Sequence, residues 1–307
     1  MLTDPASTHA ARTPAKEIRG LLRTMRPKQW TKNSVVFAAL VFDGKLLQPV
    51  LLAKTTGAFI IFCLISSAVY LINDLVDIDK DCAHPTKRYR PLPSGKLSPR
   101  VARAAAAGIP AICIPASFLL GTFFGFVVTG YLVLMIAYSF VLKNHVIIDV
   151  LTLAAGFVLR VAAGTVIFPV TRFSPWLYVC TTLLALFLGL SKRRQELVLL
   201  SANANNHRAA LIEYNIPFLD EMIALVTSTT VMAYSLYTFS APNLPKNHTM
   251  MLTIPFVLYC LFRYLYLIHV RGEVSPPDEL LTKDRPLFIA VVLWGMTSVA
   301  ILYWLPL

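Results

Sequence analysis

Long apolar runs, separated by short polar connections, recur along almost the whole 307-residue chain. Most of them approach the roughly 20 residues that an α-helix needs to cross the hydrocarbon of a bilayer. The first run is the least regular, because Asp43 and Lys45 shorten it. The pattern predicts about nine spanning helices, at residues 33–49, 51–73, 100–121, 124–142, 146–168, 173–191, 217–239, 251–270 and 286–306.

The composition agrees with a membrane protein. Hydrophobic residues make up 56% of the chain and charged residues only 14%, whereas a soluble domain carries about 25% charged residues. Neither a strand-rich region nor a glycine-rich phosphate loop is found in the sequence. The fold class predicted is therefore all-α, a multi-pass transmembrane helical bundle. We expect residues 1–20 to be a disordered cytoplasmic N-terminus and residues 21–307 to be one transmembrane catalytic domain.

Lysine and arginine are distributed very unevenly over the predicted connections. With a cytoplasmic N-terminus, 22 of the 28 lie on the cytoplasmic side, as the positive-inside rule requires. The net charge of +12 therefore belongs mostly to one face. Anionic lipid headgroups are sufficient partners for that face, and nucleic acid is not implied.

An acidic cluster ends the second predicted span, in the sequence "YLINDLVDIDKD". On a continued helix, Asn73, Asp74, Asp77 and Asp81 fall within one arc of about 100°. Three carboxylates and an amide on one face repel one another unless a cation lies among them, and such hard oxygen ligands suit Mg²⁺. The pattern predicts a metal site, although a solvated helix end neutralised by nearby basic residues has the same appearance.

A basic, proline-rich loop, "HPTKRYRPLPSGK", follows the acidic cluster. Arginine grips phosphate in a bidentate manner, so Lys87, Arg88 and Arg90 are candidates for binding a substrate's phosphate groups. The alternative is that these cations only determine membrane topology.

A third polar group, "SKRRQEL", ends the sixth predicted span. Lys192, Arg193 and Glu196 repeat the spacing of Asn73, Asp74 and Asp77, so they share one helical arc, and Arg194 points away from it. The two spans would then present an acidic and a basic face to one cavity. Topology alone accounts for the basic residues but not for Glu196 on the same face, for which a solvated side chain is the alternative.

Two further groups are candidates for binding a lipid or sugar phosphate. In "RPKQWTKN", Lys28, Lys32 and Asn33 precede the first span, where an ordinary interfacial anchor is the alternative. Arg160 lies in the middle of a predicted span. A charge there is costly unless it faces a polar cavity or a partner.

The motif NDxxDxxxD at the end of the second helix, followed by a basic proline-rich loop, resembles the UbiA superfamily of intramembrane prenyltransferases. The resemblance extends from about residue 20 to the end and implies a UbiA-like fold. Members normally carry a second Asp-rich motif near the end of helix six, where this chain has Lys192-Arg193-Arg194-x-Glu196. Within the superfamily, "RPKQWTKN", "GLSKRRQEL", "TKDR" and the acidic segment are similar to the decaprenyl-phosphate phosphoribosyltransferase branch.

This resemblance implies a Mg²⁺-dependent enzyme of the bacterial inner membrane, with its active site facing the cytoplasm. Its substrates would be 5-phosphoribosyl-1-pyrophosphate and a polyprenyl phosphate lipid, in arabinan and cell-wall precursor synthesis. A homo-oligomer is compatible with this expectation. The implied catalytic residues are Asp74, Asp77 and Glu196, the implied metal ligands are Asn73, Asp74, Asp77 and Asp81, and the implied substrate-binding residues are Lys28, Lys32, Asn33, Tyr70, Lys87, Arg88, Arg90, Arg160, Lys192 and Arg193.

Two other functions are compatible with parts of the sequence. An ordinary prenyltransferase would move an isoprenyl group from its diphosphate to an aromatic acceptor, but the missing second Asp motif argues against it. A transporter of an anionic metabolite or lipid would use the basic face and Arg160. That function gives no reason for the acidic cluster, and the connections on the opposite side are short.

Overall fold

The computed structural model describes residues 14–83, 87–170, 174–201, 213–242 and 244–304, in which helices are joined by turns and irregular segments and no strand is present. The α-helices are α1 (Pro14–Thr24), α2 (Ala38–Phe42), α3 (Pro49–Val76), α4 (Ile78–Ala83), α5 (Pro99–Leu120), α6 (Thr122–Phe140), α7 (Ile148–Val166), α8 (Trp176–Ser201), α10 (Ile216–Ser240), α11 (Ile254–His269), α12 (Pro277–Lys283) and α13 (Arg285–Trp304). Four segments are 3₁₀ helices: η1 (Pro27–Phe37), η2 (Lys87–Tyr89), η3 (Leu142–Asn144) and η4 (Thr249–Thr253).

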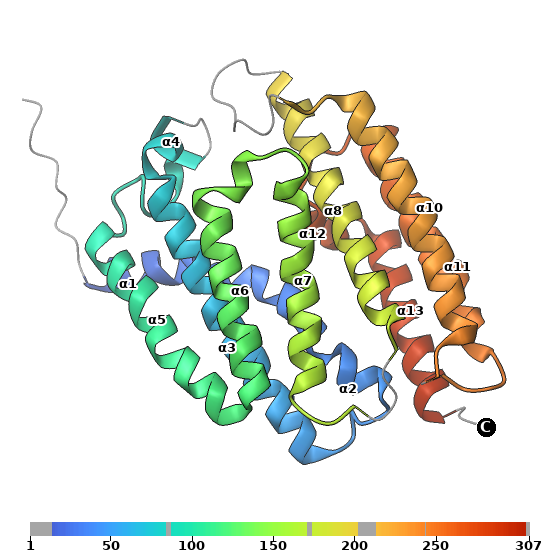
Figure 1. The fold of residues 1–307 in the computed structure, drawn as a ribbon. Helices are drawn as coiled ribbons and strands as arrows, with labels where there is room; N and C mark the ends of the chain where they lie inside the picture. Colours follow the sequence, from blue (N-terminus) through green and yellow to red (C-terminus); the bar gives the residue numbers. More distant parts are fainter. Residues whose placement is uncertain (1–13, 84–86, 171–173, 202–212, 243, 305–307) are drawn as a thin grey trace, which may run out of the picture.

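The long helices stand side by side in a bundle (Figure 1). Seven helical segments of the described residues are long and apolar enough to cross a membrane, namely α3, α5, α6, α7, α10, η4 with α11, and α13. The 26-residue helix α8 matches an eighth predicted span. The protein is therefore a multi-pass, all-α membrane protein, and the predicted fold class is confirmed.

Large apolar side chains cover the outside of the bundle. Leu119 is 91% exposed, Phe123 73% and Met296 65%. Such a surface would drive association in water, whereas lipid acyl chains cover it without cost. The buried side chains divide into two main apolar clusters, one around α3, α6 and α7 and the other around α8, α10 and α11.

The first predicted span, at 33–49, is wrong as a continuous α-helix. This part of the chain is the 3₁₀ helix η1, followed by the five-residue helix α2. Side chains three residues apart line up on a 3₁₀ helix, so Trp30, Asn33 and Val36 share one face. Trp30 donates to Ser67 Oγ of α3 at 3.0 Å, and Val36 is fully buried.

A glycine lets η1 approach α7 closely. A Cβ atom added to Gly164 of α7 would overlap the carbonyl oxygen of Val36. The backbone of η1 therefore packs directly on α7 at Val36.

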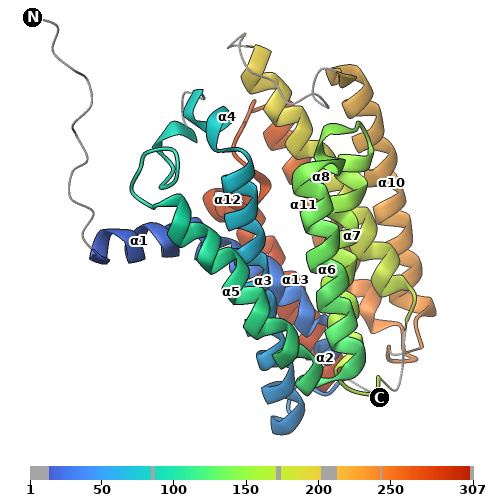
Figure 2. The same cartoon turned by 60° about the vertical axis from the view of Figure 1, so that its left-hand side comes forward.

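The N-terminal expectation also needs a correction. Residues 14–24 form helix α1, so the segment expected to be disordered, 1–20, overlaps a helix, and residues 1–13 lie outside the described part. In Figure 2, α1 lies crosswise to the long helices. Gly20 lies close to the backbone carbonyl of Lys96, so α1 packs against the loop before α5.

Polar connections gather at one end of the bundle. Figure 1 shows α4, the end of α8 and the start of α10 at the same end, opposite to α2. The acidic cluster, the basic loop and the "SKRRQEL" segment all belong to this end, which we call the polar end.

Candidate active site

The acidic cluster lies where α3 passes into α4. Helix α3 ends at Val76, Asp77 is its C-cap, and α4 begins at Ile78, so the predicted continuous helix is interrupted by one residue. The Asp77 N–H still donates to the carbonyl of Asn73, and the Asp81 N–H donates to the carbonyl of Asp77. The chain therefore keeps a nearly helical course, with Asp74 and Asp81 both buried.

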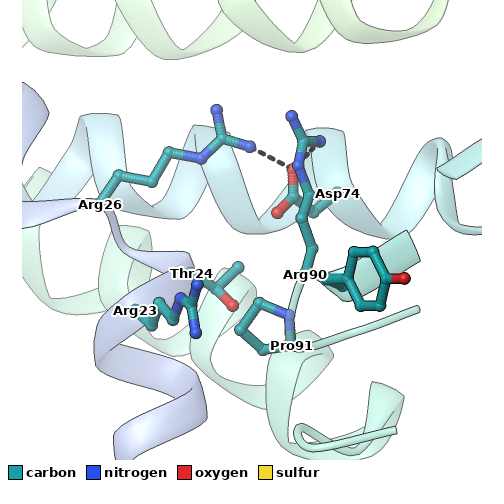
Figure 3. Close-up of a pocket in the computed structure, with 7 residues that line it drawn as sticks. Arg23, Thr24, Arg26, Asp74, Arg90 and Pro91 are labelled. Atoms are coloured by element: carbon teal, nitrogen blue, oxygen red, sulfur yellow. Dashed lines mark hydrogen bonds and ion pairs between the residues drawn. The ribbon is translucent and has the colours of Figure 1, made fainter. Parts of the chain in front are cut away.

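Two arginines bind the buried carboxylates. Arg26 donates to Asp74 Oδ1 at 2.5 Å, and Arg90 of the basic loop donates to the same atom at 3.3 Å (Figure 3). Arg90 also donates to Asp81 Oδ2 at 2.7 Å. Arg26 lies over the ring of Tyr70, with its guanidinium carbon 4.8 Å from the ring centroid. Arg90, a predicted phosphate-binding residue of the basic loop, thus binds the acids together with Arg26, which was not among the predicted site residues.

A cavity of about 160 Å³ opens beside these ion pairs. Its lining combines a single acid with several cations and comes from the end of α1 and the junction after it, from α3, and from η2 and the loop after it (Figure 3). The lining residues are Arg23, Thr24, Arg26, Asp74, Tyr89, Arg90 and Pro91. A lining with three arginines and one aspartate favours an anionic ligand such as a phosphate group.

The third carboxylate of the cluster has a different partner. Lys143 of η3, between α6 and α7, donates from Nζ to both carboxylate oxygens of Asp77, at 2.7 and 2.8 Å. Lys143 is only 3% exposed, so its charge is balanced within the protein. This ion pair ties the end of α3 to the α6–α7 connection.

The first turn of α7, directly after this connection, binds Arg193 of α8. Arg193, 1% exposed, donates from Nε to Asp149 Oδ2 of α7 at 2.6 Å and pairs with Glu196 on its own helix. The Tyr214 hydroxyl donates to Asp149 Oδ1 at 2.9 Å. Burial, together with the nearby charge of Asp149, raises the pKa of Tyr214 to about 12, so its hydroxyl keeps its proton at neutral pH. Acid and cation are thus paired in a buried network around Arg193.

The backbone between Lys143 and Asp149 is strained. Ile147 has φ 68° and ψ −48°, and the N–H of Ile148 bonds to the carbonyl of Val146 at 2.7 Å. A β-branched residue rarely adopts a positive φ. The Tyr214 hydroxyl accepts a hydrogen bond from the Ile147 N–H at 2.7 Å, which helps to hold this turn.

The other cations predicted for the site lie nearer the surface. Lys192 is exposed, and Arg88 is exposed and donates to the hydroxyl of Tyr89 at 2.8 Å. Lys87 is half-buried in η2. Arg194, expected to point away from the site, pairs instead with Asp220 of α10 at 2.5 Å. The structure therefore brings Arg193 and Glu196 together, while Lys192 is exposed.

Arg160 is held inside the bundle by protein groups. It donates to Asn33 Oδ1 at 2.7 Å, to the Tyr131 hydroxyl at 2.7 Å and to the carbonyl of Gly156 at 2.9 Å. Asn33 in turn donates to Ser66 Oγ of α3 at 3.2 Å. This network joins η1 to α3, α6 and α7. On η1 itself, Lys28 is exposed and Lys32 is half-buried.

Sequence reasoning missed Arg26, Lys143 and Asp149. Asp149 was the most detectable, because it is an acid within the predicted span 146–168, and an ionisable residue in a span usually has a partner. Lys143 was a single cation in a short connection, and a spacing argument gave no reason to pair it with an aspartate 66 residues away.

The oxygen donors of the acidic cluster suit Mg²⁺, but in this structure the carboxylates contact protein cations and do not converge on one point. Within the part of the chain that the structure describes, no three His, Cys, Asp or Glu side chains form a ready metal site. However, Asn73 Oδ1 is buried and has no hydrogen-bond partner. A buried carbonyl oxygen without a donor, on the residue directly before Asp74, is the ligand chemistry that Mg²⁺ prefers.

Fold and site together define an integral membrane helical bundle with paired acidic and basic side chains at its polar end. The UbiA prenyltransferase family model matches residues 34–281. A decaprenyl-phosphate phosphoribosyltransferase from Mycolicibacterium smegmatis is 31% identical over 304 residues, which cover 94% of each chain. Another from Corynebacterium glutamicum is 30% identical and covers 96% of this chain and 91% of the relative. The chain belongs to the UbiA prenyltransferase family.

Solved structures agree on the fold. A UbiA homolog from Archaeoglobus fulgidus bound to GPP and Mg²⁺ matches with a TM-score of 0.70, covering 92% of this chain and 99% of that chain. The sequence identity is 19%, so this likeness concerns the fold alone. It confirms the UbiA-like architecture predicted from the sequence.

Proposed function

We propose that this protein transfers 5-phosphoribose from 5-phosphoribosyl-1-pyrophosphate to a polyprenyl phosphate and releases pyrophosphate. The observation that carries the proposal is the likeness to decaprenyl-phosphate phosphoribosyltransferases over almost the full length of both chains. The basic residues around Arg193 on α8 support it. The donor and the lipid both carry phosphate groups, so the site needs cations on α8 as well as in the basic loop.

The reaction breaks the bond between the anomeric carbon and the pyrophosphate oxygen, and the bonding electrons leave with pyrophosphate. A phosphate oxygen of the lipid forms the new bond from the opposite face, which inverts that carbon. The lipid phosphate is already ionised at neutral pH, so the step needs no general base. A bound Mg²⁺ would neutralise charge on the leaving group. The carboxylates of the acidic cluster would offset the positive charge that develops on the sugar ring.

The proposal assigns the predicted residues to parts of the substrates. Asn73, Asp74, Asp77 and Asp81 would hold the metal and the pyrophosphate end of the donor. Lys87, Arg88, Arg90, Lys192 and Arg193 would bind donor phosphates, with Tyr70 beside them and Glu196 accepting a hydrogen bond from a ribose hydroxyl. Lys28 and Lys32 would meet the lipid phosphate, and Asn33 and Arg160 would position η1, which carries both lysines.

The protein would work in the bacterial inner membrane, with the polar end facing the cytoplasm, where the soluble donor is made available. The distribution of lysine and arginine supports this orientation. The exposed apolar side chains on the outside of the bundle would contact the polyprenyl tail where it passes from the bilayer to the protein.

The decisive experiment incubates the purified protein with labelled 5-phosphoribosyl-1-pyrophosphate and a short polyprenyl phosphate, and measures label in the lipid extract. We expect Mg²⁺-dependent transfer, and we expect large losses in Asp77→Asn and Lys192→Ala. The matched controls are Asp79→Asn, an exposed acid of α4, and Lys246→Ala, an exposed cation before η4. Full activity in both site variants would remove the site as assigned.

The same assay separates the competing functions. An isoprenyl diphosphate with an aromatic acceptor replaces the two substrates in a parallel reaction. If no label enters the lipid extract with phosphoribosyl pyrophosphate under several metals, and prenyl transfer occurs, the protein is a prenyltransferase instead.

A further inference from the structure

Each carboxylate of the acidic cluster is paired with a cation from the protein. Asp74 is bound by Arg26 and Arg90, Asp81 by Arg90, and Asp77 by Lys143. In these ion pairs of the described residues, three negative charges therefore face three positive charges. The cations come from three separate elements: the α1–η1 junction, the loop after η2, and η3.

Burial makes these pairs interdependent. Asp74 is 1% exposed, Asp81 3% and Lys143 3%. A buried charge that loses its partner costs several kcal/mol. The carboxylates and Lys143 therefore cannot change partner alone, whereas the side chains of Arg26 and Arg90 are 29% and 30% exposed and line the cavity. A carboxylate that leaves its arginine or lysine needs a new cation, and the released cation needs a new anion.

We propose that these ion pairs are exchanged as a set when a diphosphate donor binds. Asp74, Asp77 and Asp81 turn from the protein cations to a divalent cation, and Arg26, Arg90 and Lys143 turn to the diphosphate. This inference rests on the proposed function only in requiring a donor with a diphosphate group. It makes Arg26 and Lys143 donor-binding residues and makes binding of the divalent cation and the diphosphate strongly cooperative.

The cooperativity follows from charge balance. A divalent cation alone would draw Asp77 away from the buried Lys143 and add positive charge to the cluster. A diphosphate alone would draw Arg90 or Lys143 away and leave buried carboxylates unpaired. Both costs disappear when the two ligands bind together, and linkage requires the effect of each ligand on the other to be equal.

The backbone near two of these cations is strained. Within the described residues, three non-glycine residues have a positive φ: Arg26 at 54°, Ile147 at 68° and His248 at 56°. Arg26 is itself one of the three cations, and Ile147 lies four residues after Lys143. Backbone strain of this kind is concentrated at binding and switch sites. The unpaired Asn73 Oδ1 is a second sign that the paired arrangement is incomplete without a ligand.

Titration calorimetry on the purified full chain tests the proposal, with MgCl₂ and inorganic pyrophosphate as the probes. Each is titrated alone and then at a saturating concentration of the other, and the same titrations without protein are subtracted because Mg²⁺ and pyrophosphate also bind each other in solution. We expect each probe to tighten the binding of the other by at least roughly tenfold, which is within the usual range of coupling between sites. Equal Mg²⁺ affinity with and without pyrophosphate would overturn the proposal.

Lys143→Met gives a signature that loss of structure alone would not produce. Asp77 loses its protein cation, so Mg²⁺ alone should bind more tightly; pyrophosphate alone should bind more weakly, and the coupling should fall. The matched control is Lys45→Met, which breaks a lysine–aspartate pair with Asp43 (2.6 Å) away from the polar end. Coupling in Lys143→Met as strong as in Lys45→Met would exclude Lys143 from the exchange. If Lys143→Met does not fold, the wild-type titrations decide alone.

Pyrophosphate is the leaving group of either donor considered above, so this test does not depend on which sugar or isoprenyl group is transferred. Coupling without transfer of labelled phosphoribose would retain the exchange and refute the proposed function. Transfer of labelled phosphoribose without coupling would support the proposed function and refute the exchange.

Discussion

The buried pair Arg193–Asp149 offers a quantitative test of the network between α7 and α8. Both residues are 1% exposed, and their side chains are joined at 2.6 Å. Arg193→Met removes the guanidinium at nearly constant length and leaves Asp149 buried and charged. Its remaining partners are the Tyr214 hydroxyl and the Val150 N–H.

The magnitude follows from those contacts. Removing one member of a buried ion pair costs about 3–5 kcal/mol, and the two remaining hydrogen bonds place this case near the lower end, at about 3 kcal/mol. At roughly 2–4 °C per kcal/mol, the Tm should fall by roughly 6–12 °C. The double variant Arg193→Met with Asp149→Asn removes the unpaired charge and should recover about half of the loss.

Thermal unfolding in detergent with a thiol-reactive dye measures this, because Cys63 and Cys113 are buried and free. The control is Arg194→Met, on the same helix, whose partner Asp220 is 35% exposed on its side chain. A partly exposed pair is worth less than about 1 kcal/mol. A Tm for Arg193→Met equal to that of the control, or a double variant worse than the sum of the singles, would refute the reasoning.

Three further predictions concern packing, the buried polar network and orientation. Gly164→Ala should destabilise the protein by about 1–3 kcal/mol, because its methyl group would overlap the carbonyl of Val36, whereas Gly130→Ala faces open space and should be neutral or slightly stabilising in the same thermal assay. Asn33→Leu leaves the Nε–H of Arg160 without an acceptor and should lower the free energy of unfolding by about 1–3 kcal/mol. An unchanged Tm would show that water replaces the amide. A membrane-impermeant maleimide should label exposed Cys82 in inverted vesicles and not in right-side-out cells, and the opposite result would reverse the proposed topology.

Much of the fold could be predicted because its signals are local. A stretch of about 20 apolar residues specifies a spanning helix by itself, whatever its neighbours are. Eight of the nine predicted spans therefore correspond to helices, and the exception, η1, carries Asn33, whose amide needs partners on other helices. The α-helical prediction failed there because tertiary contacts and the close approach to Gly164 decide the backbone.

The candidate site divides in the same way. Helical rotation placed Asp74 and Asp81 on one side, and both meet Arg90 in the structure. Rotation also put Arg193 and Glu196 together and Arg194 apart from them. It did not distinguish Lys192, which is exposed, from Arg193, which is among the most deeply buried side chains.

The sequence alone determined that this is a helical membrane protein with a basic face, an acidic helix end and the motifs of the UbiA family. The length of the apolar runs, the distribution of charge and the spacing of residues can all be read from the order of residues without knowledge of the packing. Only the tertiary structure decided which cation meets which acid. Lys143 reaches Asp77 across 66 residues and Arg26 reaches Asp74 across 48. Ion pairing depends on separations of a few ångströms between side chains on different helices, and helix packing rather than sequence distance determines these separations.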